Sequence, residues 1–336
     1  MVKIAIDAMG GDFGPEPIVK GCIQALKKKL FIPILVGKKD EILPLLPKRY
    51  RAKISIVEAD DIISMSDAAT DAVKRKESTI YKAIDLVKKG EADGVVSAGH
   101  SGATMTLATL RLGRLKGVSR PALATLMPTR TGRRSILLDA GANVDSKAQH
   151  IAEFAVMGGC YAEDLLKIEN PSIGILANGE EASKGNEVTK EAFKILEGYK
   201  GFKGNVEGSD IFNGSCDVIT CDGFVGNLVL KASEGVASTI SGLIKDYIRK
   251  SPVAITGALL MRKVFKLLKK QMDYEEVGGA PLLGIKGCAI VSHGKSGPKA
   301  MKNAIFQAIS YTETGVNEHI VHRIAELKEK EKEEEV

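Results

Sequence analysis

The chain has 336 residues, a net charge of +6, 44% hydrophobic and 27% charged residues, and only 5% aromatic residues with no tryptophan. This length and composition predict a soluble globular protein with a sizeable core, and the few aromatic side chains argue against a stacking platform for nucleic-acid bases. The five cysteines form no CxxC pair, which argues against a disulfide framework or a zinc site and fits a reducing cytosol.

Neither end of the chain predicts a targeting or membrane-spanning segment. The start, MVKIAIDAMGG, has too short an apolar stretch for a signal peptide, and no run reaches the roughly 18 apolar residues of a membrane span. Residues 325–336 form a mixed-charge run, which predicts a frayed, solvated helix end. The body therefore carries the positive excess, which favours an acidic partner, an anionic membrane surface or an anionic substrate.

Short β-branched runs alternate with longer amphipathic stretches along the chain. This alternation predicts a parallel or mixed sheet in a single α/β domain over 1–336. Several strand runs are apolar throughout, as expected where helices cover both faces of a sheet. Only PTRTGRR separates the fifth strand from the sixth, which predicts a hairpin-like, antiparallel pair. The predicted strands span 3–8, 32–37, 53–58, 93–98, 122–127, 135–140, 172–177, 217–222 and 288–293.

Six predicted strands end in glycine mixed with Asp, Asn, Ser, His or Lys. Ligands bind beyond the carboxyl ends of the strands in an open α/β sheet, and glycine lets the backbone approach a ligand closely. The helix N-termini that follow present N–H groups and a positive dipole end, which suit an anion. The six loops therefore predict a shared active-site crevice. They read DAMGGD, SAGHSGA, LDAGANVD, LANGEEASKGN, CDGFVGN and SHGKSG.

The first of these loops lies within DAMGGDFGP at residues 7–15. Its sequence indicates whether the crevice suits a nucleotide or bare phosphate. It does not fit the GxGxxG fingerprint of dinucleotide binding, and no GxxxxGK[ST] occurs in the chain. Many short glycine loops suit a small anion and an extended second substrate better than a dinucleotide.

These residues resemble the PlsX family, the acyl-[acyl carrier protein]:phosphate acyltransferases of bacterial phospholipid synthesis. The motifs are DAMGGD, SAGxxGA, LDxGANVD, the GEE…KGNE run, CDGFVGN followed by LVLK, and GGAPLLGIKG, in the family's order over roughly residues 2–320. The resemblance implies a three-layer α/β/α sandwich with a large mixed, mostly parallel sheet, similar to isocitrate dehydrogenases and phosphotransacetylases, and a homodimer. The chain departs from the family at His100 and Ser101, usually Asn and Thr, at Phe13, commonly His, and at Lys295, commonly Ser.

The resemblance implies transfer of a fatty acyl group from acyl carrier protein to inorganic phosphate, giving acyl phosphate and the free carrier. Phosphate is already an anion near pH 7, and the leaving thiol has a pKa of about 8.5, so neither needs much acid or base catalysis. The enzyme then mainly positions an anion and stabilises a tetrahedral oxyanion. No GxSxG elbow and no Cys–His pairing in register indicate a covalent acyl-enzyme.

Two residues are predicted to be catalytic. Lys184, in EEASKGNE, follows a strand-end loop, where its ammonium could hold phosphate or the oxyanion; the alternative is a solvated lysine. The resemblance implies a catalytic role for this position. Asn227, in DGFVGN, could donate its amide to the oxyanion or phosphate, and the alternative is an N-cap of the helix that follows.

Other residues of the loops are predicted to bind phosphate or the second substrate. Aspartates at strand ends would repel phosphate, so we expect Asp7, Asp12, Asp139 and Asp222 to orient lysines, accept backbone N–H bonds or bind a metal. His100 and His293 are equally compatible with satisfied loop residues. No HExxH or Asp-cluster spacing indicates a divalent metal, and no cofactor is expected. The predicted binding residues are Asp7, Gly10, Gly11, Ser97, His100, Ser101, Gly102, Asn143, Glu181, Gly226 and His293.

The stretch ALLMRKVFKLLKKQM, residues 258–272, places most of its apolar side chains on one face of a single helix and five cations on the other. This pattern is typical of a helix that lies in an anionic membrane interface. The alternative is a helix packed on the core or on a dimer partner. The resemblance favours a helical tip over 250–275 on a cytoplasmic enzyme at the inner face of the cell membrane, which supplies a membrane acyltransferase. The predicted membrane-facing residues are Leu260, Val264, Phe265, Leu267 and Leu268.

Two other functions stay open. A short-chain phosphotransacetylase using an acyl-coenzyme A thioester would also bind phosphate and a phosphopantetheine arm, so the sequence separates it poorly from the first prediction. A non-catalytic peripheral membrane scaffold would have no need for six glycine-rich, polar strand ends. A nucleic-acid partner is disfavoured by the few aromatic residues and the absence of a recognised motif.

Overall fold

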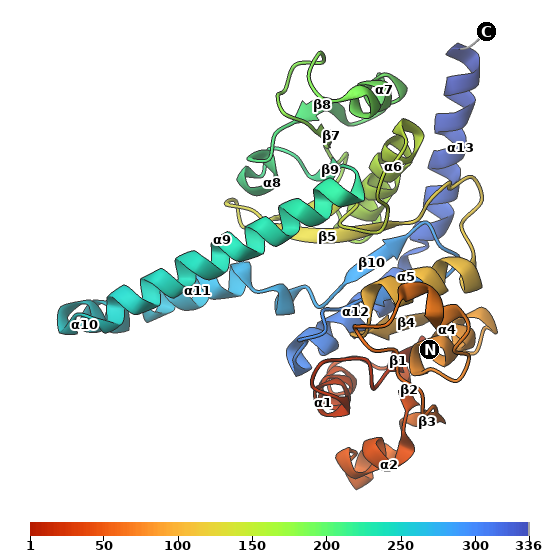
Figure 1. Cartoon of the computed structure of the whole chain (residues 1–336), viewed down its shortest axis with the longest axis vertical. Helices are drawn as coiled ribbons and strands as arrows, with labels where there is room; N and C mark the ends of the chain where they lie inside the picture. The colour runs from red at the N-terminus through yellow and green to blue at the C-terminus, as the bar shows by residue number, and fades with distance from the viewer. Residues whose placement is uncertain (335–336) are drawn as a thin grey trace.

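The computed structural model describes the backbone of residues 1–334 and the side chains of residues 1–330. Its strands form one 11-stranded sheet in the order β3-β2-β1-β4-β11-β10-β5-β6-β9-β7-β8 (Figure 1). The strands are β1 (Lys3–Asp7), β2 (Ile32–Gly37), β3 (Ser55–Glu58), β4 (Gly94–Ser97), β5 (Ala122–Pro128), β6 (Arg134–Leu138), β7 (Ile173–Leu176), β8 (Phe202–Val206), β9 (Val218–Thr220), β10 (Ala280–Leu283) and β11 (Cys288–Val291).

The helices connect these strands and extend well beyond them in one place. The α-helices are α1 (Pro15–Leu26), α2 (Lys39–Ile42), α3 (Lys48–Arg51), α4 (Thr79–Lys88), α5 (Ser101–Leu107), α6 (Ala148–Asp164), α7 (Glu187–Leu196), α8 (Asp210–Asn213), α9 (Gly223–Arg249), α10 (Pro252–Leu260), α11 (Arg262–Met272), α12 (Pro298–Thr314) and α13 (Val316–Glu334). The short 3-10 and π turns are η1 (Leu43–Leu45), η2 (Ala69–Val73), η3 (Ala108–Leu112) and η4 (Tyr274–Glu276). None of the helices in the described part of the chain has the length and apolar character needed to cross a membrane.

The sheet consists of two parallel blocks that run in opposite directions. One block contains β3, β2, β1, β4 and β11, and the other contains β6, β9, β7 and β8. Between the blocks, β10 and β5 are each antiparallel to both of their neighbours. The hairpin predicted between the fifth and sixth strands is therefore confirmed, and the sheet is mixed but mostly parallel.

Helices cover both faces of the sheet because the strands bury both sets of alternating side chains. In β1, Ile4 and Ile6 join the core cluster that includes α1 and α12, whereas Ala5 between them joins the cluster that includes α4. In β6, Leu138 packs in the cluster of α6 and Leu137 in the cluster of α8. The apolar strand runs predicted helices on both faces, and the result is the three-layer α/β/α arrangement that the resemblance implies.

All the predicted strands are present to within a few residues, and two further strands were missed. β8, FKGNV, contains a glycine, an asparagine and a lysine, which weaken any strand pattern. β10, APLL, is a four-residue strand with a proline, and it pairs with β11 on one side and β5 on the other. Both strands depend on long-range pairing rather than on local preference.

Helices α9, α10 and α11 form an arm, residues 223–272, that projects from the sandwich, with α11 running back beside α9 (Figure 1). The single helix predicted over 258–272 is wrong, because α10 ends at Leu260 and α11 begins at Arg262. Leu260 thus belongs to a different helix from the other predicted membrane-facing residues. Leu260 is 83% exposed and Leu267 is 67% exposed.

The charged segment near the C-terminus is partly packed on the sandwich. Leu327 of α13 is buried, and Lys328 Nζ lies 2.9 Å from Glu153 Oε1 on α6. The first residues of the stretch predicted to fray, 325–336, therefore belong to a docked helix. The side chains of 331–336 lie outside the described residues.

Candidate active site

Three of the glycine-rich loops follow the parallel strands β1, β4 and β11, and they lie together. At the ends of β1 and β4, Ser97 Oγ donates to Asp7 Oδ2 over 2.8 Å and accepts Gly99 N at 3.0 Å. The loop after β11 joins them where Asp12 N donates to Gly294 O over 2.8 Å. We call the loops DAMGGD, SAGHSGA and SHGKSG the first loop group.

Asp7 holds this group together from inside. It is 1% exposed, and its burial raises the pKa of the carboxyl although Ser97, Thr79 and the backbone N–H groups of Met9 and Gly10 bond to it. An added Cβ at Gly10 would lie 2.5 Å from Asp7 Oδ2, so only glycine fits there. Asp7 and Ser97 thus join the ends of β1 and β4 through the bonds they make to each other and to the loop backbone, and a contact of either residue with phosphate stays a prediction.

Thr79, which sequence reasoning missed, bonds to Asp7 from the first turn of α4. No local motif marks it, because it reaches the site only through the packing of α4 on β1. Nothing short of the three-dimensional arrangement identifies it.

The two histidines of the first loop group are both hydrogen-bonded loop residues. His100 Nδ1 accepts Ala103 N at 3.1 Å and caps α5, and His293 Nδ1 accepts Lys295 N at 3.1 Å. In each neutral imidazole the proton then sits on Nε2, which can donate to an anion. The resemblance implies asparagine at position 100, and asparagine is a common N-cap, so His100 serves the same capping role at the start of α5.

The loops after β6 and β9 form the second loop group, LDAGANVD and CDGFVGN. Asp139 accepts the backbone N–H groups of Leu123 at 3.0 Å and Asn143 at 2.7 Å, and its burial raises the pKa of the carboxyl. Asn143 Nδ2 donates to Asp139 Oδ2 over 2.8 Å and to Pro121 O over 2.7 Å. Both N–H bonds of this amide are used, so Asn143 fixes the loop and offers no amide donor to phosphate in this arrangement.

Asn227 lies in the second turn of α9 and is not its N-cap. Asp222 caps the helix, because its Oδ1 accepts Phe224 N at 2.8 Å and its Oδ2 accepts Ser146 N at 2.7 Å. Asn227 is exposed, and its Cβ lies 3.3 Å from where a Cβ on Gly141 would stand. The capping alternative is therefore removed, which leaves the Asn227 amide available to a ligand.

The two loop groups meet, although they do not share one edge of the sheet as predicted. Because the two parallel blocks run in opposite directions, their carboxyl ends point to different sides. Packing joins them: Ala140 and Ala142 of the second group belong to one apolar cluster with Val291 at the end of β11, Met105 of α5 and Leu230 of α9. The candidate site lies where α5 and the start of α9 approach the loops.

The loop with Lys184 and Glu181 follows β7, the neighbour of β9 in the sheet. Asn205 Nδ2 donates to Glu181 O over 2.9 Å, which ties the loop to β8. Lys184 is exposed, and its Cγ would lie 2.8 Å from a Cβ on the buried Gly179 beneath it. The loop thus starts beside the second group and presents Lys184 to solvent, three residues before α7 begins.

No accessible thiol is found near either group in the described structure. All five cysteines are buried, and burial raises the pKa of the Cys221 thiol beside Asp139 above its usual range. A buried, protonated thiol is a poor nucleophile. Within residues 1–330, no three His, Cys, Asp or Glu side chains stand close enough to hold a metal ion.

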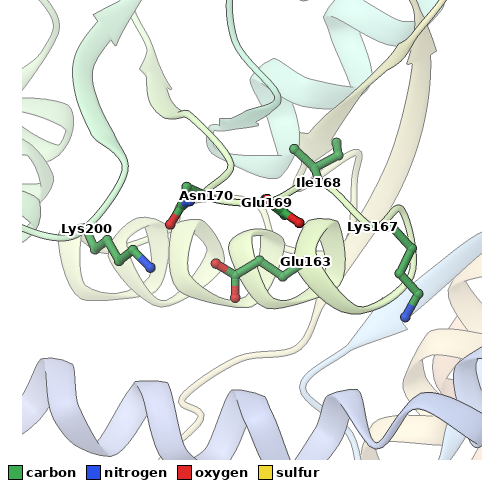
Figure 2. A pocket seen from close by; sticks show the side chains of 6 residues that line it. All are labelled: Glu163, Lys167, Ile168, Glu169, Asn170 and Lys200. Carbon is green, nitrogen blue, oxygen red and sulfur yellow. The ribbon is translucent and has the colours of Figure 1, made fainter.

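A hollow of about 450 Å³ lies elsewhere, at the amino ends of β7 and β8 (Figure 2). It therefore opens at the opposite end of these strands from the loop with Lys184. It contains none of the predicted site residues. Its lining residues are Glu163, Lys167, Ile168, Glu169, Asn170 and Lys200.

Comparisons with known proteins agree with this arrangement. The model of the family "Fatty acid synthesis protein" matches residues 2–319. The phosphate acyltransferase of Sulfurimonas denitrificans is 82% identical over 98% of this chain and 100% of its own length, and that of Nitratiruptor sp. is 60% identical over 97% and 99%.

Solved structures match the fold at low sequence identity. A phosphotransacetylase from Streptococcus pyogenes has a TM-score of 0.60 and 21% identity over 93% of this chain and 94% of its own. A branched-chain phosphotransacylase from Enterococcus faecalis has a TM-score of 0.58 and 15% identity over 94% and 100%. The predicted likeness to phosphotransacetylase folds is confirmed. Given the full-length match to the family and to its phosphate acyltransferases, the chain belongs to the fatty acid synthesis proteins of the PlsX family and is an acyltransferase.

Proposed function

We propose that this acyltransferase moves the acyl group of a fatty acyl-[acyl carrier protein] to inorganic phosphate. A phosphate oxygen attacks the thioester carbonyl carbon, and the carbonyl oxygen becomes an oxyanion. Collapse of this intermediate breaks the C–S bond, releases acyl phosphate, and leaves the carrier thiolate, which takes a proton from water. The proposal is carried by one observation: glycine-rich loops meet beside an exposed amide, Asn227, while every thiol is buried.

The two loop groups divide the work in this proposal. The first group holds phosphate through the backbone N–H groups of Gly11 and of the Ser101–Gly102 segment and through Nε2 of His100 and His293, while the Gly10 N–H stays bonded to Asp7. The Asn227 amide donates to the developing oxyanion, and Lys184 adds a positive charge from the loop after β7. Such preorganised donors provide most of the catalysis when nucleophile and leaving group are both competent.

The test is an assay of the purified protein with palmitoyl-acyl carrier protein at varied phosphate concentration. Free carrier thiol and hydroxylamine-trapped acyl phosphate are measured together. We expect equal amounts of both, and only when phosphate is present. Thiol without phosphate would indicate a thioesterase. Turnover of acetyl-coenzyme A in place of the carrier substrate would indicate a short-chain phosphotransacetylase, and no turnover of either would overturn the proposed substrate.

We propose further that the arm docks on the anionic inner face of the cell membrane. In α11, Val264, Leu267 and Leu268 are each at least 46% exposed, opposite a face formed by Arg262, Lys263, Lys266, Lys269 and Lys270. Exposed apolar residues opposed by cations suit an anionic interface. Acyl phosphate would then be released beside the membrane acyltransferase that consumes it.

Along α9, exposed apolar side chains recur at intervals of three and four residues, at Val236, Ile240, Leu243 and Tyr247. Such a stripe suits a second copy of the same helix. We therefore retain the homodimer as part of the proposal.

Vesicle flotation tests the membrane proposal. Leu267→Glu places a carboxylate on the apolar face of α11, so we expect it to reduce flotation with anionic vesicles at least 5-fold, a magnitude set by the cost of inserting a charge. The matched control is Leu30→Glu, a 79% exposed leucine in the body of the protein, which should float like the unchanged chain. Flotation that ignores lipid charge, or that survives Leu267→Glu, contradicts the proposal.

A further inference from the structure

The arm joins the sandwich at two roots, and both lie at the candidate active site. The outgoing root is the first turn of α9, which Asp222 caps beside the second loop group. The returning root is the segment Asp273–Gly278, which contains η4 and leads into β10 (Figure 1). The chemistry described above assigns no task to the returning root.

The returning root contacts the loop after β11 with two side chains. Gly297 N donates to Glu275 Oε1 over 3.1 Å, and the ring of Tyr274 lies 5.7 Å from the ring of His293. An added Cβ at Gly297 would lie 2.6 Å from Glu275 Oε1. The carboxylate therefore sits directly on the backbone at one end of this loop, and the tyrosine lies against the other end.

The backbone beneath Glu275 is fixed from the other side. Asn303 Nδ2, on α12, donates to Glu275 O over 2.7 Å. Lys299 Nζ, one turn before it, lies 2.7 Å from Asp273 Oδ2 and 2.8 Å from Glu276 Oε1. These bonds tie η4 to α12, so Glu275 presents its carboxylate from an anchored segment.

The loop that Glu275 contacts is itself bonded to the loop after β1. Gly294 O, within the loop that Glu275 holds, accepts Asp12 N at 2.8 Å. An added Cβ at Gly11 would lie 3.4 Å from the same Gly294 oxygen. A displacement of the His293–Gly297 loop would therefore move the DAMGGD backbone that is proposed to hold phosphate.

We infer that Glu275 is a positioning residue for acyl transfer. Its carboxylate holds the His293–Gly297 loop in the conformation that aims His293 and the DAMGGD backbone at phosphate. The returning root of the arm is thus a working part of the site, and the inference rests on the proposed function. Because a misplacement of about 1 Å can cost ~10²-fold in rate, the loss of this one contact should be measurable.

The test compares three variants in the acyl phosphate assay at varied phosphate. Glu275→Ala removes the acceptor, and we expect about 10- to 100-fold lower kcat/KM for phosphate, mainly through a higher KM. Glu275→Gln keeps an oxygen at Oε1 and should stay within about 3-fold of the unchanged protein. Glu276→Ala is the matched control, because it removes a neighbouring acid and leaves the Gly297 contact in place. Asp273 still pairs with Lys299 and Asn303 still holds the Glu275 carbonyl, so η4 stays anchored and this variant should also remain within about 3-fold.

Amide hydrogen exchange of residues 293–297 provides a second measurement that does not depend on turnover. Exchange should be faster in Glu275→Ala alone. An unchanged KM for phosphate in Glu275→Ala, or equal impairment of the Gln and Ala variants, overturns the inference. If the unchanged protein makes no acyl phosphate, the proposed function fails instead. In that case the amide hydrogen exchange of residues 293–297 tests whether Glu275 holds the loop. An exchange rate that is unaltered in Glu275→Ala overturns the inference.

Discussion

Gly226→Ala is expected to abolish most of the acyl phosphate activity, by at least about 10²-fold, and to lower stability by about 1–3 kcal/mol. Gly226 is buried in the first turn of α9, and a Cβ there would overlap the carbonyl oxygen of Asp139. The same methyl group would stand 3.0 Å from Cys221 Sγ. Backbone on one side and a buried thiol on the other leave little room, so α9 must move away from the second loop group and carry Asn227 with it.

The control is Gly208→Ala, an exposed glycine where an added Cβ meets no atom within 4 Å. It should keep full activity and an unchanged melting temperature. Activity and thermal unfolding are measured for both variants. A Gly226→Ala protein with normal turnover would show that the close approach of α9 to Asp139 is not needed for function.

Sequence patterns predicted the elements of the first loop group well because each belongs to a local unit. A buried β-branched run followed by glycine and a polar residue identifies a strand and its loop without reference to the rest of the chain. Parallel pairing of β1 with β4, from Ile4–Gly94 to Asp7–Ser97, and of β4 with β11 then places three such loops side by side. The predicted meeting of these loops follows from adjacent parallel strands.

The relation between the two loop groups could not be predicted in the same way. It depends on β10, a four-residue strand with a proline that pairs through only two residues on each side. If β10 is left out, both parallel blocks run in the same direction, and all six loops fall on one edge of the sheet. With it, the second block is reversed, and the loops approach through Ala142 and Met105 instead.

The role of each predicted site residue depends on its hydrogen-bond partners, and the sequence pattern does not reveal those partners. Asn143 and Asn227 look alike in their glycine-rich motifs, yet Asn143 uses both amide N–H bonds within its loop and Asn227 remains exposed.

The boundaries of helices were also predicted wrongly where the sequence pattern is uniform. The apolar and basic periodicity of 258–272 continues through Met261, where the backbone ends one helix and begins the next. Periodicity describes a face, and it does not locate a break within a continuous pattern.

Asn227→Asp is expected to lower kcat about 10²- to 10³-fold while the protein stays folded, since the loss of one oxyanion donor costs that much. The aspartate keeps the shape of the side chain but replaces an N–H donor with a negative charge, which repels both phosphate and the oxyanion. Because Asp222, and not Asn227, caps α9, thermal unfolding should be nearly unchanged. If the Asn227 amide donates to the oxyanion, Asn227→Ala should lower kcat by a similar factor. Unchanged turnover in Asn227→Ala would show that Asn227 takes no part in the mechanism.

Lys184→Ala is expected to lose at least about 10²-fold in turnover, with Lys190→Ala as the control on α7, the helix that follows the loop. Both lysines are exposed, so neither substitution should alter stability, and the difference between them isolates position from net charge. Lys184→Arg retains the charge on a longer, planar group and should recover part of the activity. Equal turnover in the two alanine variants would assign Lys184 to the solvated surface and leave the Asn227 amide and the glycine backbone to stabilise the oxyanion alone.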